Sequence, residues 1–192
     1  MATAEANHEA GRRGVMQVKG WLEATTHLTM QWNVYDNTAI CSRPRLDGGI
    51  KRYDLLGQFI GERQRPAVVE VKAYNTVGGQ AAEYVEFLAN AYSTTAWEIA
   101  TLGDDTKTEF IWVTTHPFSQ TKWAELTSRS ELAKAVETHR EWLGKDHTVD
   151  EDLLVTVASR LWLLVRHERQ SEISLTNSEL YKIYEHIGRK PS

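Results

Sequence analysis

The fold is decided by two apolar segments, RYDLLGQFI (residues 52–60) and PAVVEVKAY (residues 66–74). The connection between them, residues 61–65, is short and polar. Two apolar runs joined in this way predict an antiparallel β-hairpin. The second segment begins with apolar residues on both of its faces, which is typical of a central strand buried on both sides.

Three charged residues interrupt this apolar hairpin: Asp54 in the first strand, and Glu70 and Lys72 in the second. Because successive side chains of a strand point to opposite faces, Glu70 and Lys72 share one face. Burying a carboxylate and an ammonium group there is costly unless they are paired or bind something. The hairpin also brings Asp54 within reach of Glu70, so the three residues are expected to form one cluster.

Such a cluster suits a divalent metal ion. Mg²⁺ prefers hard oxygen ligands and usually accepts only one or two protein carboxylates. Asp54 and Glu70 would supply these carboxylates, and the backbone carbonyl of Val71 could supply a third ligand. A bound ion lowers the pKa of its water, and Lys72 could orient or deprotonate that water and stabilise developing charge. The expected cofactor is therefore Mg²⁺ or Mn²⁺.

Helices and strands are predicted on both sides of the hairpin from the spacing of apolar residues. Before residue 119 they are a helix over 8–24 with Asn7 as its N-cap, an irregular β-rich stretch over 28–40, a Gly-rich turn over 75–79, a helix over 80–102 and a strand over 109–115. The remaining third is predicted to be helical throughout.

Three helices are expected in this last third: 121–143, 150–168 and 178–187. Thr148 with Glu151, and Thr176 with Glu179, have the spacing of a capping box at a helix start. The apolar run 153–165 is expected to be a helix that is buried in the core or against a partner subunit. We therefore predict an α/β fold with a core over 1–118 and a helical C-terminal extension over 119–192, packed on the same domain.

The order Asp54, hairpin, Glu70-Val71-Lys72 at the end of an apolar strand resembles the PD-(D/E)xK nuclease superfamily. This resemblance implies a restriction-endonuclease-like core of helix, three-stranded β-meander, helix and strand. It also implies that Asp54, Glu70 and Lys72 are the catalytic residues, with the metal held by Asp54, Glu70 and Val71.

A second motif supports the same resemblance. The helix from residue 80 opens with Gln80 and Tyr84, which is similar to the QxxxY motif of the RecB-like and lambda-exonuclease-like branch. A spacing of four places the two side chains one turn apart on one helix face. Near the helix N-terminus they could reach a phosphate, so the resemblance implies that both bind the substrate.

The implied function is hydrolysis of DNA phosphodiester bonds by a divalent-metal-dependent nuclease, as a subunit or effector in DNA repair or anti-phage defence. The alternative is an inactive nuclease-fold subunit that binds nucleic acid or a partner protein. The superfamily often adds an acidic ligand from the first helix, for which Glu9 and Glu23 are candidates.

Other charged side chains have both a functional and an ordinary interpretation. His116 follows a strand end, where it could approach DNA or serve the turn before Pro117. Four basic residues precede the site: Arg43, Arg45, Lys51 and Arg52. They could contact phosphates or form an ordinary charged loop.

Composition narrows the remaining classes of function. The single cysteine, Cys41, cannot by itself ligate an iron–sulfur cluster or form an internal disulfide. The net charge of −4 is not that of a protein binding nucleic acid by basicity alone, so a partner protein or a homo-oligomer through the C-terminal helices is expected to help. The polar N-terminus and the lack of a long apolar run predict a cytoplasmic protein without a membrane partner.

Overall fold

The computed structural model describes residues 4–60, 64–73, 78–184 and 186. In chain order the elements are α1 (Ala4–Thr25), β1 (Leu28–Asn33), β2 (Ser42–Pro44), β3 (Ile50–Arg52), β4 (Leu55–Phe59), β5 (Pro66–Lys72), α2 (Gln80–Leu102), β6 (Glu109–Thr114), η1 (Gln120–Glu125), α3 (Arg129–Thr138), η2 (Arg140–Leu143), α4 (Glu151–Ala158), β7 (Leu161–Val165), α5 (Gln170–Ile173) and α6 (Asn177–Tyr184). The α/β class is confirmed. The predicted connection 61–65 and the turn 75–79 lie partly outside the described residues.

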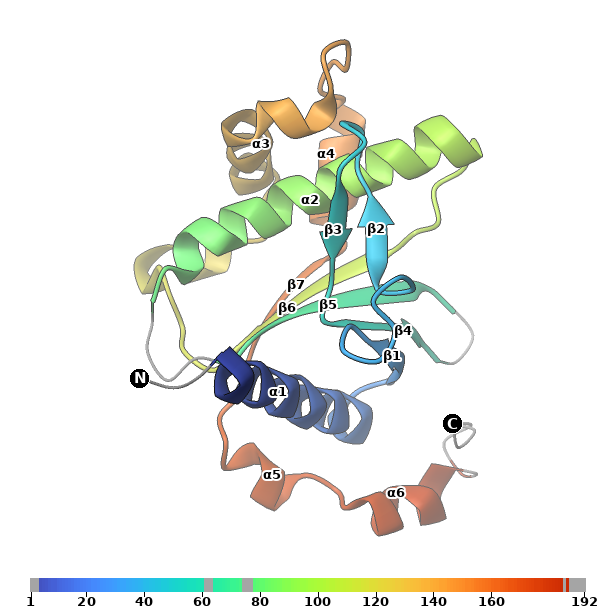
Figure 1. The fold of residues 1–192 in the computed structure, drawn as a ribbon, viewed down its shortest axis with the longest axis vertical. Helices are drawn as coiled ribbons and strands as arrows, with labels where there is room; N and C mark the ends of the chain where they lie inside the picture. Colours follow the sequence, from blue (N-terminus) through green and yellow to red (C-terminus); the bar gives the residue numbers. More distant parts are fainter. Residues whose placement is uncertain (1–3, 61–63, 74–77, 185, 187–192) are drawn as a thin grey trace.

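Five strands form a mixed sheet in the order β1-β4-β5-β6-β7, while β2 and β3 form a separate antiparallel pair (Figure 1). The pairs β1–β4 and β4–β5 are antiparallel, and β5–β6 and β6–β7 are parallel. Apart from the inserted β2–β3 pair, the elements along the chain follow the predicted order of a helix, three antiparallel strands, a helix and a further strand: α1, β1, β4, β5, α2 and β6.

The predicted hairpin is confirmed, with Leu55 opposite Val69 in the β4–β5 pair. Its first strand is shorter than expected, because the chain leaves the ladder at Tyr53 and Asp54 before β4 begins. Gly57 allows β1 to lie close to this hairpin: a Cβ atom at this position would lie 2.0 Å from the Thr29 carbonyl oxygen. Any larger residue would push the two strands apart.

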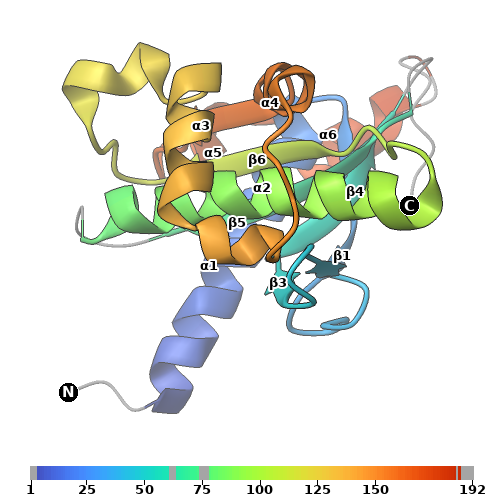
Figure 2. The ribbon, with the colours of Figure 1, turned by 90° about the horizontal axis from the view of Figure 1, so that it is seen from above.

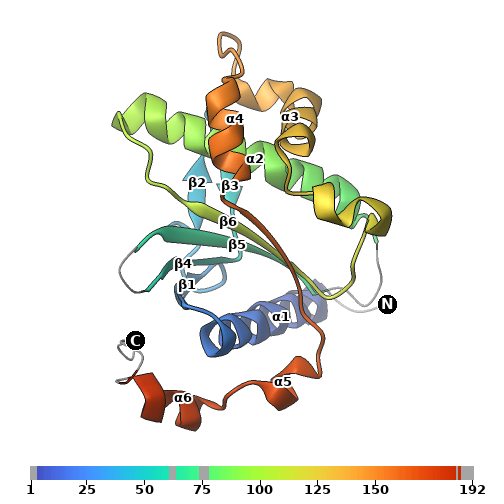
Figure 3. The same cartoon turned by 180° about the vertical axis from the view of Figure 1, so that it is seen from behind.

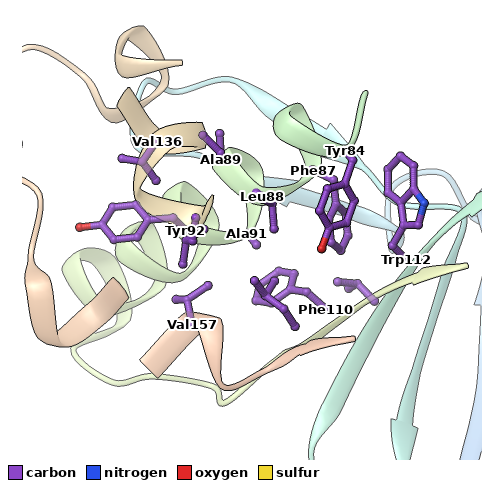
Figure 4. Close-up of a cluster of buried hydrophobic side chains, with 14 of the residues drawn as sticks. Tyr84, Phe87, Leu88, Ala89, Ala91, Tyr92, Phe110, Trp112, Val136 and Val157 are labelled. Carbon is purple, nitrogen blue, oxygen red and sulfur yellow. The ribbon is translucent and has the colours of Figure 1, made fainter. Parts of the chain in front are cut away.

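Two apolar layers hold helices on opposite faces of the sheet. On one face, α2, α3 and α4 pack on the sheet through a cluster rich in aromatic rings (Figures 2 and 4). This cluster contains Tyr84, Phe87, Phe110, Trp112, Val136 and Val157. On the other face, Val15, Val18 and Leu22 of α1 pack against the sheet. Residues after 118 thus share one core with residues before it.

The prediction of a helix over 153–165 is wrong. α4 ends at Ala158, and Leu161–Val165 form β7, which pairs with β6 so that Leu161 lies opposite Phe110. Arg160, between the two, forms two hydrogen bonds with the Asp105 carboxylate, at 2.7 and 2.5 Å. This ion pair fixes the α4–β7 turn beside the segment that leads into β6. A short apolar run fits a buried strand as well as a buried helix. Here it forms a strand because its backbone pairs with the edge of β6.

Three other helix predictions also differ from the structure. The stretch 121–143 is not one helix but η1, α3 and η2 in succession. α1 begins at Ala4, so Asn7 lies inside the helix and is not its N-cap. α4 is capped by Asp150, whose side chain accepts the N–H groups of residues 152 and 153, rather than by Thr148.

The second capping box is confirmed. The Thr176 N–H donates to the Glu179 carboxylate at 2.7 Å, and the Glu179 N–H donates to the Thr176 hydroxyl at 3.4 Å. α6 therefore starts at Asn177, one residue before the predicted start, and the predicted end at residue 187 lies outside the described residues. Among the described residues, no helix combines the length and the apolar character required to span a bilayer.

Candidate functional site

The structure brings the three charged residues of the hairpin together where β4 and β5 begin to separate. The Asp54 Oδ2 atom accepts a hydrogen bond of 2.7 Å from the Val71 N–H. Asp54 therefore takes the place of a main-chain partner beside β5. Continuing the register Leu55–Val69 by one residue places Asp54 opposite Glu70, as the hairpin predicts.

Glu70 is 7% exposed and carries an ammonium group on each side. Its Oε1 atom lies 3.0 Å from Lys72 Nζ, and its Oε2 atom lies 2.9 Å from Lys51 Nζ. Lys72 also pairs with Glu83 of α2 at 2.7 Å and lies 5.3 Å from the centre of the Trp112 ring. Glu70 and Lys72 therefore share the α2 face of the sheet, as the alternation of side chains predicts.

Two members of this cluster were not predicted as site residues. Lys51 was predicted only as part of the basic stretch before the site. It lies in the β2–β3 hairpin, which places its ammonium group beside Glu70. Glu83 lies between Gln80 and Tyr84 in the α2 sequence and had no distinguishing signal. Their positions depend on how β3 and α2 pack on β5, which no local pattern encodes.

Asp54 is a carboxyl group with an altered acidity. Its pKa is raised from 3.8 to about 6, chiefly by burial and next by the nearby negative charge of Glu70. The hydrogen bond from the Val71 N–H and the charges of Lys72 and Lys51 oppose this rise. Two carboxyl groups that repel each other in a partly buried place would both be stabilised by a divalent cation between them.

Val71 has the orientation required of a third ligand. Its N–H points to Asp54, and the N–H and C=O groups of one strand residue point to the same side. The Val71 carbonyl is therefore directed toward the Asp54 side of β5. Two carboxylates and a carbonyl match the all-oxygen set that Mg²⁺ and Mn²⁺ accept, so the residues present fit the expected ion.

The first helix does not add an acidic ligand to this set. Glu23 accepts a hydrogen bond from the Met30 N–H at 2.9 Å and pairs with Lys19 at 3.1 Å. Glu9 is exposed on α1. Over residues 4–60, 64–73, 78–184 and 186, no group of three or more histidine, cysteine, aspartate or glutamate side chains is positioned to hold a metal ion. The site thus rests on Asp54, Glu70 and a main-chain carbonyl.

Gln80 and Tyr84 are placed differently from the expectation that they face a substrate. Gln80 is fully buried: its Oε1 atom accepts from the Thr114 hydroxyl at 2.5 Å, and its Nε2 atom donates to the His116 carbonyl at 3.3 Å. Tyr84 is 2% exposed and donates to the Leu126 carbonyl at 3.1 Å. These bonds tie the first turn of α2 to the end of β6 and to the segment after η1. In this structure the pair positions α2, and with it Glu83, rather than pointing at solvent.

The basic stretch largely serves local structure. Arg43 donates to the carbonyls of residues 40 and 42, and Arg45 pairs with Asp47 and lies 4.5 Å from the centre of the Trp142 ring. Arg52 is exposed. Of the four residues, Lys51 is the one that reaches the carboxylate cluster.

Comparison with known proteins assigns no family to the chain: no family model and no curated protein matches it. Among solved structures it is similar to the Cap4 SAVED/CARF-domain containing receptor of Moraxella osloensis, with a TM-score of 0.38 and 10% identity over 93% of this chain and 36% of that chain. The corresponding receptor of Acinetobacter baumannii, solved with the cyclic trinucleotide 3'3'3'-cAAA, gives a TM-score of 0.34 and 10% identity over 95% of this chain and 36% of that chain. The chain thus spans 36% of the length of these receptors. Similarity this distant carries no argument about fold family or function.

Proposed function

We propose that this protein is a divalent-metal-dependent nuclease of the PD-(D/E)xK type, with a restriction-endonuclease-like core, that hydrolyses phosphodiester bonds of DNA. The observation that supports it is the convergence of Asp54, the Val71 main chain and the Glu70–Lys72 pair at one point of the sheet. Each member comes from the motif that led to the expectation. The biological setting that we propose is DNA repair or anti-phage defence.

Each residue has a distinct role in this proposal. Asp54, Glu70 and the Val71 carbonyl hold Mg²⁺ or Mn²⁺, which would supply an acidic water and neutralise phosphate charge. Lys72 holds its ammonium beside Glu70 at 3.0 Å, where it orients the attacking water and stabilises negative charge on the phosphate. Glu83 fixes the Lys72 ammonium from the α2 side at 2.7 Å.

A second candidate function has an observation in its favour. Both Glu70 oxygens are already paired with lysines, and such a cluster can serve as a closed structural ion-pair network. The protein would then be an inactive nuclease-fold subunit that binds nucleic acid or a partner. Calorimetric titration with Mn²⁺ separates the two: binding that is lost in Asp54→Asn supports the nuclease, and the absence of both binding and cleavage supports the inactive subunit.

The decisive experiment is cleavage of circular and linear, single- and double-stranded DNA by purified protein with Mg²⁺ or Mn²⁺. Lys72→Ala is expected to abolish cleavage while metal binding and the circular dichroism spectrum are retained. The matched control is Lys134→Ala, because Lys134 is exposed and pairs with Glu131 on the same helix, α3; it should cleave like the wild type. Metal-dependent cleavage that survives in Lys72→Ala would overturn the assignment.

A further inference from the structure

Arg166 is a buried arginine that forms no ion pair with the other described residues. The residue is 7% exposed, and its backbone N–H completes the β7–β6 ladder by donating to the Thr114 carbonyl at 2.8 Å. Its buried Nε atom has no hydrogen-bond partner, and none of the ion pairs between described residues includes it. Burial lowers the pKa of Arg166 from its usual value, and the negative charge of Glu168 opposes this change without cancelling it.

The Arg166 side chain lines a pocket of about 330 Å³ at the carboxyl ends of the three parallel strands. The pocket is lined by Gln17, Ala73, Thr115, His116, Arg166, His167 and Glu168. Ala73, Thr115 and Arg166 each follow the last residue of β5, β6 or β7, and Gln17 comes from α1. Figure 3 shows β7 leaving the sheet here and passing α1 on its way to α5.

The surroundings of Arg166 favour an anion. The Nδ1 atom of His167 accepts the Arg169 N–H at 3.2 Å, which leaves Nε2 as the protonated, donating nitrogen. Glu168 is the one acidic side chain among the lining residues; it is exposed and forms no ion pair with Arg166. A guanidinium group offers five donors in a planar fork that matches the oxygens of a phosphate.

We propose that this pocket is a phosphate-binding subsite in which Arg166 holds a backbone phosphate of the nucleic acid. The inference rests on the proposed function and extends it with a substrate contact that no sequence motif indicated. A buried guanidinium that lacks a close counter-ion and has an unpaired Nε–H group is costly in the free protein. An incoming phosphate reduces this cost by supplying a close negative charge and hydrogen-bond acceptors.

The subsite lies close to the metal-binding residues without belonging to them. Lys72 is at the end of β5 and Arg166 follows the end of β7, and these strands flank β6. Neighbouring strands are about 4.8 Å apart, so the two backbones are separated by about 10 Å along one edge of the sheet. Lys72 faces α2, whereas Ala73 and the pocket face α1. A single strand crossing this edge would place one phosphate near Lys72 and a nearby one at Arg166.

The test is binding of a fluorescein-labelled oligonucleotide in EDTA, followed by anisotropy over a range of salt concentrations. Arg166→Met keeps the length of the side chain but removes the charge, and should weaken binding and reduce the slope of log K against log salt by about 0.7 to 0.9, the value for one lost phosphate contact. Arg169→Met is the control, because Arg169 is exposed and pairs with Glu172; it should leave the slope unchanged. Arg166→Lys, which restores a positive charge, should recover most of the slope.

A second measurement separates binding from a structural role. Inorganic phosphate should raise the thermal midpoint of the wild type but not that of Arg166→Met, which should itself be at least as stable as the wild type. An Arg166→Met protein with the wild-type slope, or one that is destabilised while phosphate leaves the wild type unaffected, would overturn the subsite. These assays contain no metal and therefore do not depend on cleavage. Arg166-dependent binding in EDTA, together with no cleavage when Mg²⁺ or Mn²⁺ is supplied, would overturn the nuclease proposal alone.

Discussion

At the residue scale, Asp54 is the group whose chemistry depends most on its surroundings. It lies beside a second carboxylate, it is partly buried, and its pKa rises from 3.8 to about 6. Since folding raises the pKa of this acid, the folded protein binds a proton more tightly than the unfolded chain. The resulting stability is fully present below 3.8 and is lost as pH rises through about 6.

Asp54→Asn should remove this pH dependence. Asparagine keeps a side-chain oxygen to accept the Val71 N–H but carries no charge. In EDTA, the variant should therefore gain free energy of unfolding relative to the wild type as pH rises from below 3.8 to above 6. Denaturant titrations over this range measure the effect, with the exposed Asp146→Asn as control. Parallel pH profiles of Asp54→Asn and the wild type would contradict the altered pKa.

The same residue predicts how metal binding depends on pH. Binding of Mn²⁺ requires the ionised carboxylate and should release a proton where Asp54 is still protonated. The affinity should rise as pH increases toward about 6 and level off above it. Calorimetry in buffers of different ionisation enthalpy reports the released proton directly. A pH-independent affinity would mean that Asp54 does not ligate the ion.

Tyr84→Phe tests whether the QxxxY pair acts through structure. The substitution removes only the hydroxyl that donates to the Leu126 carbonyl and should cost about 1 kcal/mol of stability. Because the Tyr84 side chain is buried among Phe87, Trp112 and Phe118, the affinity for DNA in EDTA should not change. Denaturant titration and anisotropy measure the two effects. A loss of DNA affinity at unchanged stability would restore the direct substrate contact implied by the motif.

At the element scale, α4 and β7 belong to the core, although the sequence predicts that their segment is part of a C-terminal extension. Leu154 of α4 is 1% exposed, whereas the neighbouring Val155 is 55% exposed. Leu154→Ala should destabilise the protein by about 2 to 5 kcal/mol, and Val155→Ala by less than about 0.5 kcal/mol. Denaturant unfolding of the two variants measures this difference. Equal, small effects would mean that the segment is an appendage that unfolds separately.

At the scale of the whole molecule, α5 and α6 lie beyond α1 (Figure 1). Both helices carry exposed apolar side chains. Ile173 is 85% and Tyr181 66% exposed. The predicted homo-oligomer through the C-terminal helices would cover these side chains. The double variant Ile173→Asp, Tyr181→Asp should therefore have a lower mass by light scattering than the wild type. Leu102→Asp, at a 59% exposed site at the end of α2, should not. A wild type that is monomeric at every concentration would exclude this interface.

The sequence by itself determined the hairpin, the order of the first six core elements, and the meeting of Asp54 with Glu70 and Lys72. These features follow from local alternation and from a short connection, which fix both the register and the face of each side chain. Tertiary structure alone decided that residues 161–165 form a strand. A short apolar run can form a helix or a strand, and here the unpaired edge of β6 provides backbone hydrogen-bond partners for a strand. Tertiary structure also placed Lys51 and Glu83 at the site and buried Gln80, Tyr84 and Arg166. These contacts join segments that are distant in the sequence, so they depend on packing that no local sequence pattern indicates.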